Sequence, residues 1–185
     1  MSGMHEEELL MSSAGTDGEP AVTYEEMICL LEACLIEQPF PQNLMSHIAY
    51  YFISRFRQSM PALRLLLNSG YPAEAGNILR MLVEYTITLK FIANQPDIRA
   101  SRFIEEASII PLHPEFEMLA MAEETKMLDW FHSIYLPYSS AITMHSSREL
   151  DELFVPGCHE DCDTMDLLAL SCDLAVVLLD CIRSL

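Results

Sequence analysis

Apolar residues recur along the chain at spacings of three and four, which is the period of an α-helix. The alternation of apolar and polar positions that is typical of a β-strand is not evident in any segment. We therefore expect an all-α fold, a single-domain bundle of about seven or eight helices with short connections. The predicted helices cover about residues 23–38, 41–69, 72–94, 96 onward, 114–133, 137 onward and 164 onward.

Several residues mark where these helices begin and end. Thr23 followed by Glu26 is the pattern of a capping box, in which each side chain bonds the backbone of the other residue. Pro61 is expected to kink the second helix or to restart it with Ser59 as a new cap. Gly70 suits the left-handed conformation that ends many helices.

Composition suggests a short tail ahead of one helical domain. Residues 1–20 are polar, contain several Gly and Ser without a helical period, and are expected to be mobile, whereas residues 21–185 form the domain. The opening segment lacks the basic stretch and apolar run of a secretory signal. The chain also lacks the run of about 18 uncharged apolar residues that a membrane span needs. These features predict a cytoplasmic protein with reduced cysteines.

The net charge of the chain makes some classes of binding partner unfavourable. With 10 basic and 28 acidic residues, the formal net charge is −18. Such an acidic chain lacks the basic surface that binds a nucleic-acid backbone, and it repels anionic membranes. We therefore expect neither nucleic acid nor membrane as a partner, and look instead to a small ligand, another protein or a second copy of the chain.

The last predicted helix carries one narrow polar stripe. Asp166, Asp173 and Asp180 recur every seven residues, and nearly all other positions are apolar. Two interpretations remain open. The helix either belongs to the core with one edge in water, or it contributes an apolar face to a homodimer.

The helix predicted over residues 72–94 combines a largely apolar surface with a second polar stripe. Asn77, Arg80, Glu84 and Thr88 fall within one quadrant of a helical wheel. A surface ion pair would explain Arg80 and Glu84, but the order Arg before Glu is the less favourable one in a helix. The alternatives are a buried structural network and a site that faces a ligand.

The segment NSGYPAEAGNILRMLVEY resembles the signature helix of a family of uncharacterised, all-helical bacterial proteins. Members carry Gly-Tyr, Glu-Ala, and an Arg and a Glu four residues apart, with a Tyr, a Ser and a His downstream. In this chain Arg80 and Glu84 match the first part. The candidates for the second part are Tyr135, Ser139 or Ser140, His145 and Ser146. The resemblance implies the helical fold, a bacterial origin, and convergence of these side chains on one site.

Two departures limit what the resemblance implies. The serine of the family lies one turn before the histidine, where this chain has Ala141. Such families are also distantly similar to the HEPN superfamily, whose active members are metal-independent ribonucleases with an Arg and a His four to six residues apart. No histidine of this chain follows an arginine at that spacing, so the resemblance does not imply that activity.

The segment CHEDCD contains the chain's strongest concentration of metal-ligating residue types. Cys158, His159 and Cys162 could supply two or three zinc ligands. A structural zinc site normally has four ligands, and no second Cys/His pair is present elsewhere. We therefore expect no metal and no cofactor.

These observations favour a noncatalytic binding or regulatory protein with a polar pocket around Arg80, Glu84 and His145. The guanidinium fork of Arg80 would hold a small anionic ligand. One alternative is a hydrolase or a nucleotide- or nucleic-acid-processing enzyme, with His145 as general acid or base and Arg80 stabilising developing charge. The other is a structural interaction module, in which the stripe only specifies the fold.

Overall fold

The computed structural model describes residues 23–37, 43–106, 117–140 and 164–183. Every regular element within these ranges is a helix, and no strand occurs in them, which confirms the predicted all-α bundle. Each helix in the same ranges is too short or too polar to cross a lipid bilayer.

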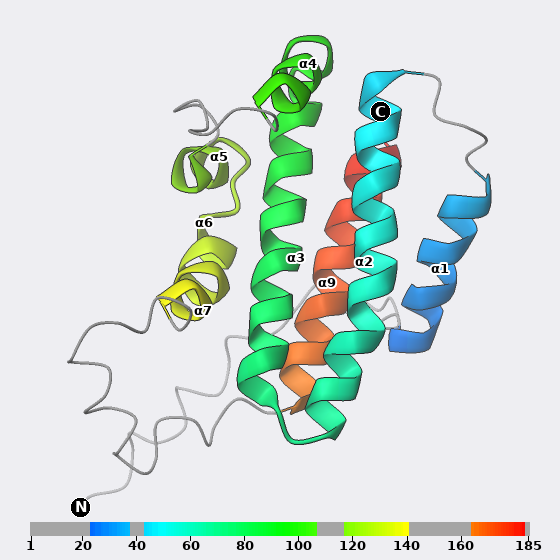
Figure 1. Cartoon of the computed structure of the whole chain (residues 1–185), viewed down its shortest axis with the longest axis vertical. Helices are drawn as coiled ribbons and strands as arrows, with labels where there is room; N and C mark the ends of the chain where they lie inside the picture. The colour runs from blue at the N-terminus through cyan, green and yellow to red at the C-terminus, as the bar shows by residue number, and fades with distance from the viewer. Residues whose placement is uncertain (1–22, 38–42, 107–116, 141–163, 184–185) are drawn as a thin grey trace, which may run out of the picture.

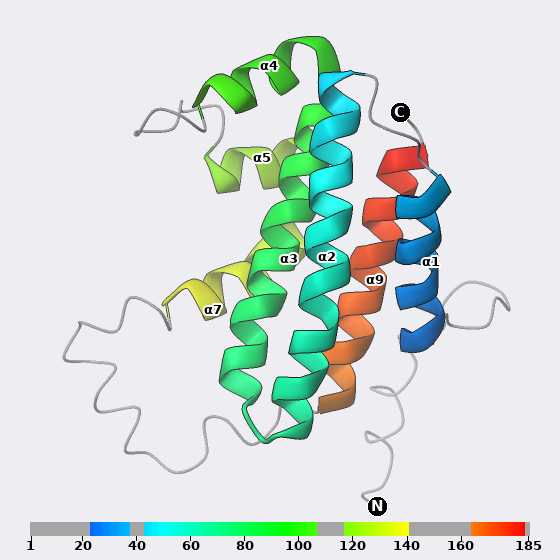
Figure 2. The same ribbon diagram turned by 45° about the vertical axis from the view of Figure 1, so that its right-hand side comes forward.

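Three long helices form the centre of the bundle: α2 (Leu44–Asn68), α3 (Pro72–Ala93) and α9 (Thr164–Arg183). α2 and α3 run antiparallel side by side, and α9 packs against both (Figure 1). α1 (Tyr24–Glu37) lies along α2 and α9 (Figure 2).

Shorter elements surround the rest of α3. α4 (Pro96–Glu106) lies across one end of α2 and α3. The elements α5 (Met118–Glu124), α6 (Leu128–Trp130), a π-helical turn η2 (Phe131–Tyr135) and α7 (Leu136–Ser140) follow one another down one side of α3. All of these except α6 pack substantially against α3.

The core is built around α3. Leu79, Leu82, Val83 and Ile87 have no exposed surface, as expected of a helix that is apolar on most sides. Phe56 of α2 is equally buried. The position of α3 therefore follows from the amount of apolar surface that it must remove from water.

α9 is also a core helix, with one exposed edge. Asp173 and Asp180 lie on that edge, whereas Leu174 and Leu178 are fully buried. The polar stripe predicted from the seven-residue spacing therefore faces solvent at these two positions. Self-association of the chain stays a prediction.

Local hydrogen bonds explain where two helices begin. The Thr23 amide donates to Glu26 Oε2 (2.8 Å) and the Glu26 amide donates to Thr23 Oγ1 (3.3 Å), which confirms the predicted capping box of α1. At the start of α2, Asn43 Oδ1 accepts a hydrogen bond from the Ser46 amide (2.8 Å).

α2 continues through Pro61, so the predicted restart with Ser59 as a cap is wrong. Proline removes the N–H group that would bond the carbonyl of Arg57. Arg57 and Pro61 are both exposed, so water can hydrate that carbonyl and the helix does not end. Ser59 is instead buried within α2.

The turn between α2 and α3 uses the predicted glycine. Gly70 has a φ of +80°, a conformation that carries little penalty only for glycine. The Gly70 amide donates to the Leu67 carbonyl (3.1 Å) and the Tyr71 amide to the Leu66 carbonyl (2.9 Å), which closes the end of α2. Pro72 then begins α3.

The helix predicted over residues 114–133 is interrupted, so that part of the prediction is wrong. α5 ends at Glu124, and Lys126 adopts the left-handed conformation with a φ of 59°. The Met127 amide donates to the Ala122 carbonyl (2.8 Å), as in a Schellman cap. Because the residue at the left-handed position is lysine and not glycine, the sequence carries no stop signal there.

Arg99 and Glu124 join α4 to α5. The two terminal nitrogens of Arg99 donate to the two carboxylate oxygens of Glu124 (2.6 and 2.9 Å), and Nη1 also donates to the Phe91 carbonyl (2.8 Å). Asn94 adds a hydrogen bond to Glu124 (3.0 Å). These hydrogen bonds, led by those from Arg99, hold the pKa of Glu124 below its ordinary value of 4.5.

The left-handed lysine gives a first prediction. Lys126→Gly should stabilise the protein by about 0.5–1 kcal/mol, because glycine removes the steric penalty of a positive φ. Urea unfolding measures the change. Gly70→Ala is the converse control: a Cβ there meets no atom within 4 Å, so its loss of about 1 kcal/mol comes from the backbone alone. A Lys126→Gly variant less stable than the wild type would contradict the left-handed turn.

The Arg99–Glu124 pair gives a second prediction. A carboxyl group with a lowered pKa in the folded state adds stability that is lost as the pH falls below about 4.5. Glu124→Gln should therefore reduce the loss of unfolding free energy between about pH 6 and about pH 3. Glu123→Gln, an exposed neighbour on α5, is the matched control and should leave the pH profile unchanged. Equal profiles for Glu124→Gln and wild type would be inconsistent with the pair.

Candidate functional site

The polar stripe of α3 borders the side covered by η2 and α7. Asn77, Arg80 and Glu84 are half-buried and succeed one another at spacings of three and four. Thr88, the fourth predicted member, is only 7 % exposed. The partly accessible stripe therefore consists of Asn77, Arg80 and Glu84.

Arg80 lies against the ring of Tyr135, the last residue of η2. Its Cζ atom is 5.4 Å from the ring centroid, within the range of a cation–π contact. Arg80 Nη1 is 3.4 Å from Glu84 Oε2, which is long for a charge-assisted hydrogen bond. Because 22 % of the Arg80 side chain and 40 % of the Glu84 side chain are exposed, this pair adds little to stability.

Two polar atoms of the stripe are buried and have no hydrogen-bond partner among the described residues. They are Nε of Arg80, a donor, and Oδ1 of Asn77, an acceptor. A buried polar atom without a partner costs about 1–3 kcal/mol. In folded proteins nearly all such atoms bond to protein or to an ordered water, and each exception needs an explanation.

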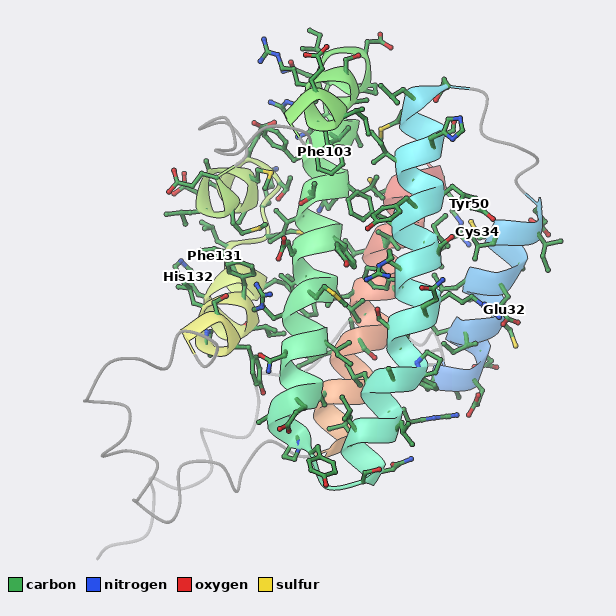
Figure 3. All side chains as sticks on the ribbon, viewed as in Figure 1. Glu32, Cys34, Tyr50, Phe103, Phe131 and His132 are labelled. Carbon is green, nitrogen blue, oxygen red and sulfur yellow. The ribbon has the colours of Figure 1, made fainter. Side chains whose placement is uncertain are left out.

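The segment that faces Arg80 has an unusual backbone. η2 is a π-helical turn, a feature that is rare and frequently found at functional sites. Within it the rings of Phe131 and Tyr135 stack, with centroids 5.2 Å apart and planes 19° from parallel. Ser139 Oγ donates to the Tyr135 carbonyl (2.5 Å), which joins η2 to α7. Figure 3 shows Phe131 and His132 on this segment, beside α3.

Gly76 and Tyr138 bring α7 close to α3, a contact that no pattern in the sequence predicts. A Cβ atom at position 76 would lie 1.9 Å from Tyr138 Cε1, so the tyrosine ring packs directly on the backbone of α3. The sequence shows Gly76 directly before Asn77, the first residue of the polar stripe. It does not show that Tyr138 packs on this glycine, because Tyr138 lies far away in the chain and no spacing rule connects the two residues.

Several predicted residues are not placed by the structure. Ser140 is the last residue of α7, and its side chain is outside the described set. His145, Cys158, His159 and Cys162 lie outside the described residues altogether. The convergence of His145 with the stripe of α3 therefore stays a prediction.

Metal-ligating side chains and cysteine thiols are the next groups to consider in the described ranges. No group of three His, Cys, Asp or Glu side chains is arranged there to hold a metal ion. Burial raises the pKa of the thiols of Cys34, Cys172 and Cys181, which keeps them protonated and poorly nucleophilic.

A pocket of about 510 Å³ lies where α2 and α4 begin and α9 ends. Met45 lines it from α2, Asn43 from the N-cap of that helix, Ala100 from α4 and Ile182 from α9. The charged side chain in its described lining is Asp97. This pocket contains none of the predicted site residues.

One stretch of the chain, which includes the polar stripe, is similar to a protein family of unknown function. Residues 46–110 match the model of a family of unknown function, DUF5677. This span includes Asn77, Arg80 and Glu84 of α3 but not Tyr135 of η2. No curated protein and no solved structure matches the chain.

A third prediction compares two arginines. Arg80→Met should change the free energy of unfolding by less than about 1 kcal/mol, because it removes a long ion pair and an unpaired donor. Arg99→Met should cost about 2–3 kcal/mol, because it removes three charge-assisted hydrogen bonds, two of them to Glu124. Chemical unfolding of both variants measures the difference. A cost of about 3–5 kcal/mol for Arg80→Met would show that Arg80 closes a buried structural network.

Proposed function

We propose that this chain is a noncatalytic binding protein that holds a small molecule by a carboxylate or phosphate group at Arg80. The observation that carries the proposal is the incomplete pairing of the Arg80 guanidinium among the described residues: its contact to Glu84 is 3.4 Å long, and its Nε atom has no hydrogen-bond partner. The side chain is 22 % exposed, so a ligand can reach part of it. The guanidinium group presents donors in a planar fork that matches both anionic groups.

The contrast with Arg99 supports a role beyond folding. Arg99 donates to Glu124 through both terminal nitrogens and to the Phe91 carbonyl, as a structural arginine is expected to do. Among the residues that the structure describes, Arg80 has one long contact to Glu84 and an aromatic ring above it. Donor capacity at Arg80 is therefore left for a ligand.

The surroundings of Arg80 also favour binding over catalysis. An enzyme would need a general acid, a nucleophile or a metal beside the anion. The described residues around Arg80 are an amide, a carboxylate paired with the arginine and an aromatic ring. The hydrolase alternative rests on His145, which lies outside the described residues.

The structure supplies a reporter for a binding experiment. Trp130 is the one tryptophan of the chain and directly precedes η2. Because the Tyr135 ring lies over the Arg80 guanidinium, a ligand that reaches Arg80 should shift η2 and change the fluorescence of Trp130.

A fourth prediction is that inorganic phosphate or acetate, titrated at constant ionic strength, changes Trp130 fluorescence in a saturable way. Arg80→Lys keeps the positive charge but loses the planar fork, and should weaken this binding at least about tenfold. Arg57→Lys is the matched control, because Arg57 pairs with Glu32 on the α1 side of the bundle. The proposal fails if neither anion is bound, or if Arg80→Lys binds as tightly as wild type.

A further inference from the structure

α2 carries no acidic residue, although the chain has 28 acidic residues and a formal net charge of −18. The other two long helices, α3 and α9, both carry carboxylates. Of the three arginines on α2, Arg57 pairs with Glu32 of α1 (2.8 Å) and Arg64 pairs with Glu25 of α1. α2 is therefore the long helix on which a second acidic molecule would meet no carboxylate of the helix itself.

The outer face of α2 is not covered by any described helix. α1, α3, α4 and α9 contact its other sides, and α2 stands in front of its neighbours in both ribbon views (Figure 1, Figure 2). Tyr51 is 52 % exposed and Leu65 is 67 % exposed on this face. Between them Gln58 and Ala62 are exposed and Ser54 is half-buried. Exposed tyrosine without charged neighbours is typical of the centre of a protein–protein interface.

These five residues form a stripe, called here the α2 stripe, whose spacing is symmetric about its middle member. The intervals between successive members are three, four, four and three residues, along Tyr51, Ser54, Gln58, Ala62 and Leu65. At 100° per residue they fall within about 80° of the helix circumference. Because the spacing is the same in both directions, two antiparallel copies of α2 bring the stripe into register with itself.

A two-fold axis at Gln58 makes the α2 stripe complementary to itself. In such an arrangement Tyr51 of each copy faces Leu65 of the other, and Ser54 faces Ala62. The contact between tyrosine and leucine removes apolar surface from water at both ends of the stripe. The small side chains of Ser54 and Ala62 let the two helices approach closely. On the axis, each Gln58 amide can donate a hydrogen bond to the amide oxygen of the other copy.

Charge also favours this face over the exposed edge of α9. Two copies of a chain with a net charge of −18 repel each other, so they associate most easily where acidic groups are absent. The edge of α9 carries Asp173 and Asp180, and a two-fold contact there would bring these carboxylates against those of the second copy. The α2 stripe contains no charged residue and avoids this repulsion.

We infer that the chain forms a homodimer by antiparallel pairing of α2, with the two-fold axis at Gln58. The occupant of the α2 stripe is thus a second copy of the same surface. This inference does not depend on the anion site proposed at Arg80, because the α2 stripe shares no residue with the polar stripe of α3.

Sedimentation equilibrium of the full chain, at about 0.15 M salt, tests the dimer. We expect twice the mass of one chain at about 100 μM protein. Gln58→Glu places one carboxylate from each copy on the axis and should raise the dissociation constant of the dimer about tenfold or more. Gln95→Glu is the matched control, because it adds the same charge at an exposed position between α3 and α4. It should leave the dissociation constant unchanged.

Cysteine cross-linking tests the antiparallel register. Tyr51→Cys and Leu65→Cys chains, mixed and then oxidised, should form a disulfide-linked dimer. Either variant alone should form no more linked dimer than wild type, because its two introduced cysteines lie about 14 residues, or about 21 Å, apart along the helix axis. Wild type oxidised in parallel measures the background from natural cysteines, such as the exposed Cys29.

Three results would overturn the inference. A wild-type chain that stays monomeric at about 100 μM does not pair through α2. A dimer that Gln58→Glu does not weaken is held together by another face of the molecule. A Tyr51→Cys chain that cross-links to itself above the wild-type background indicates parallel, and not antiparallel, pairing of α2.

Discussion

Burial of α3 is the constraint on which the rest of the structure depends. α2 and α9 enclose its apolar faces, and α4, α5, η2 and α7 cover most of what remains. A helix in this position must satisfy each of its polar side chains inside the bundle. Thr86 does so locally, since its hydroxyl donates to the Leu82 carbonyl (2.9 Å). Among the described residues no partner is found for Nε of Arg80 or Oδ1 of Asn77, as is also true of the Tyr24 hydroxyl and of Nε of Arg55.

Arg80 and Arg99 differ in how well the residues around them pair with the guanidinium group. Arg99 is 11 % exposed, and its guanidinium lies 3.6 Å from the Phe91 ring centre while it donates to three oxygen atoms. Its surroundings explain its presence through packing and hydrogen bonding alone. Arg80 is more exposed and less well paired. The described residues therefore account for Arg99 more completely than for Arg80.

The negative net charge of the chain has different electrostatic effects at long and at short distances. Over distances beyond the Debye length, about 8 Å at physiological salt, the individual charges are screened and only the overall field guides encounter. Within the stripe, the single pair Arg80–Glu84 sets the local electrostatics. A protein can therefore be strongly acidic overall and still present a cation and an anion side by side to a ligand.

Features formed by residues that are close in the sequence can be predicted without a structure. The capping box at Thr23, the left-handed turn at Gly70 and the start of α3 involve residues within about one helical turn of one another. The same holds for successive members of the polar stripe from Asn77 to Glu84. Helical spacing specifies such contacts, because the backbone alone brings the groups together.

Features that join distant segments were decided by tertiary packing. The continuation of α2 through Pro61, the cap at Lys126 and the Arg99–Glu124 pair each depend on surroundings that the local sequence does not encode. The same holds for the site: helical spacing aligns Arg80 with Glu84, but only the packing of η2 against α3 places Tyr135 over the guanidinium. Burial gives the polar groups of this stripe their energetic weight, because an unpaired polar group is costly only where water is excluded.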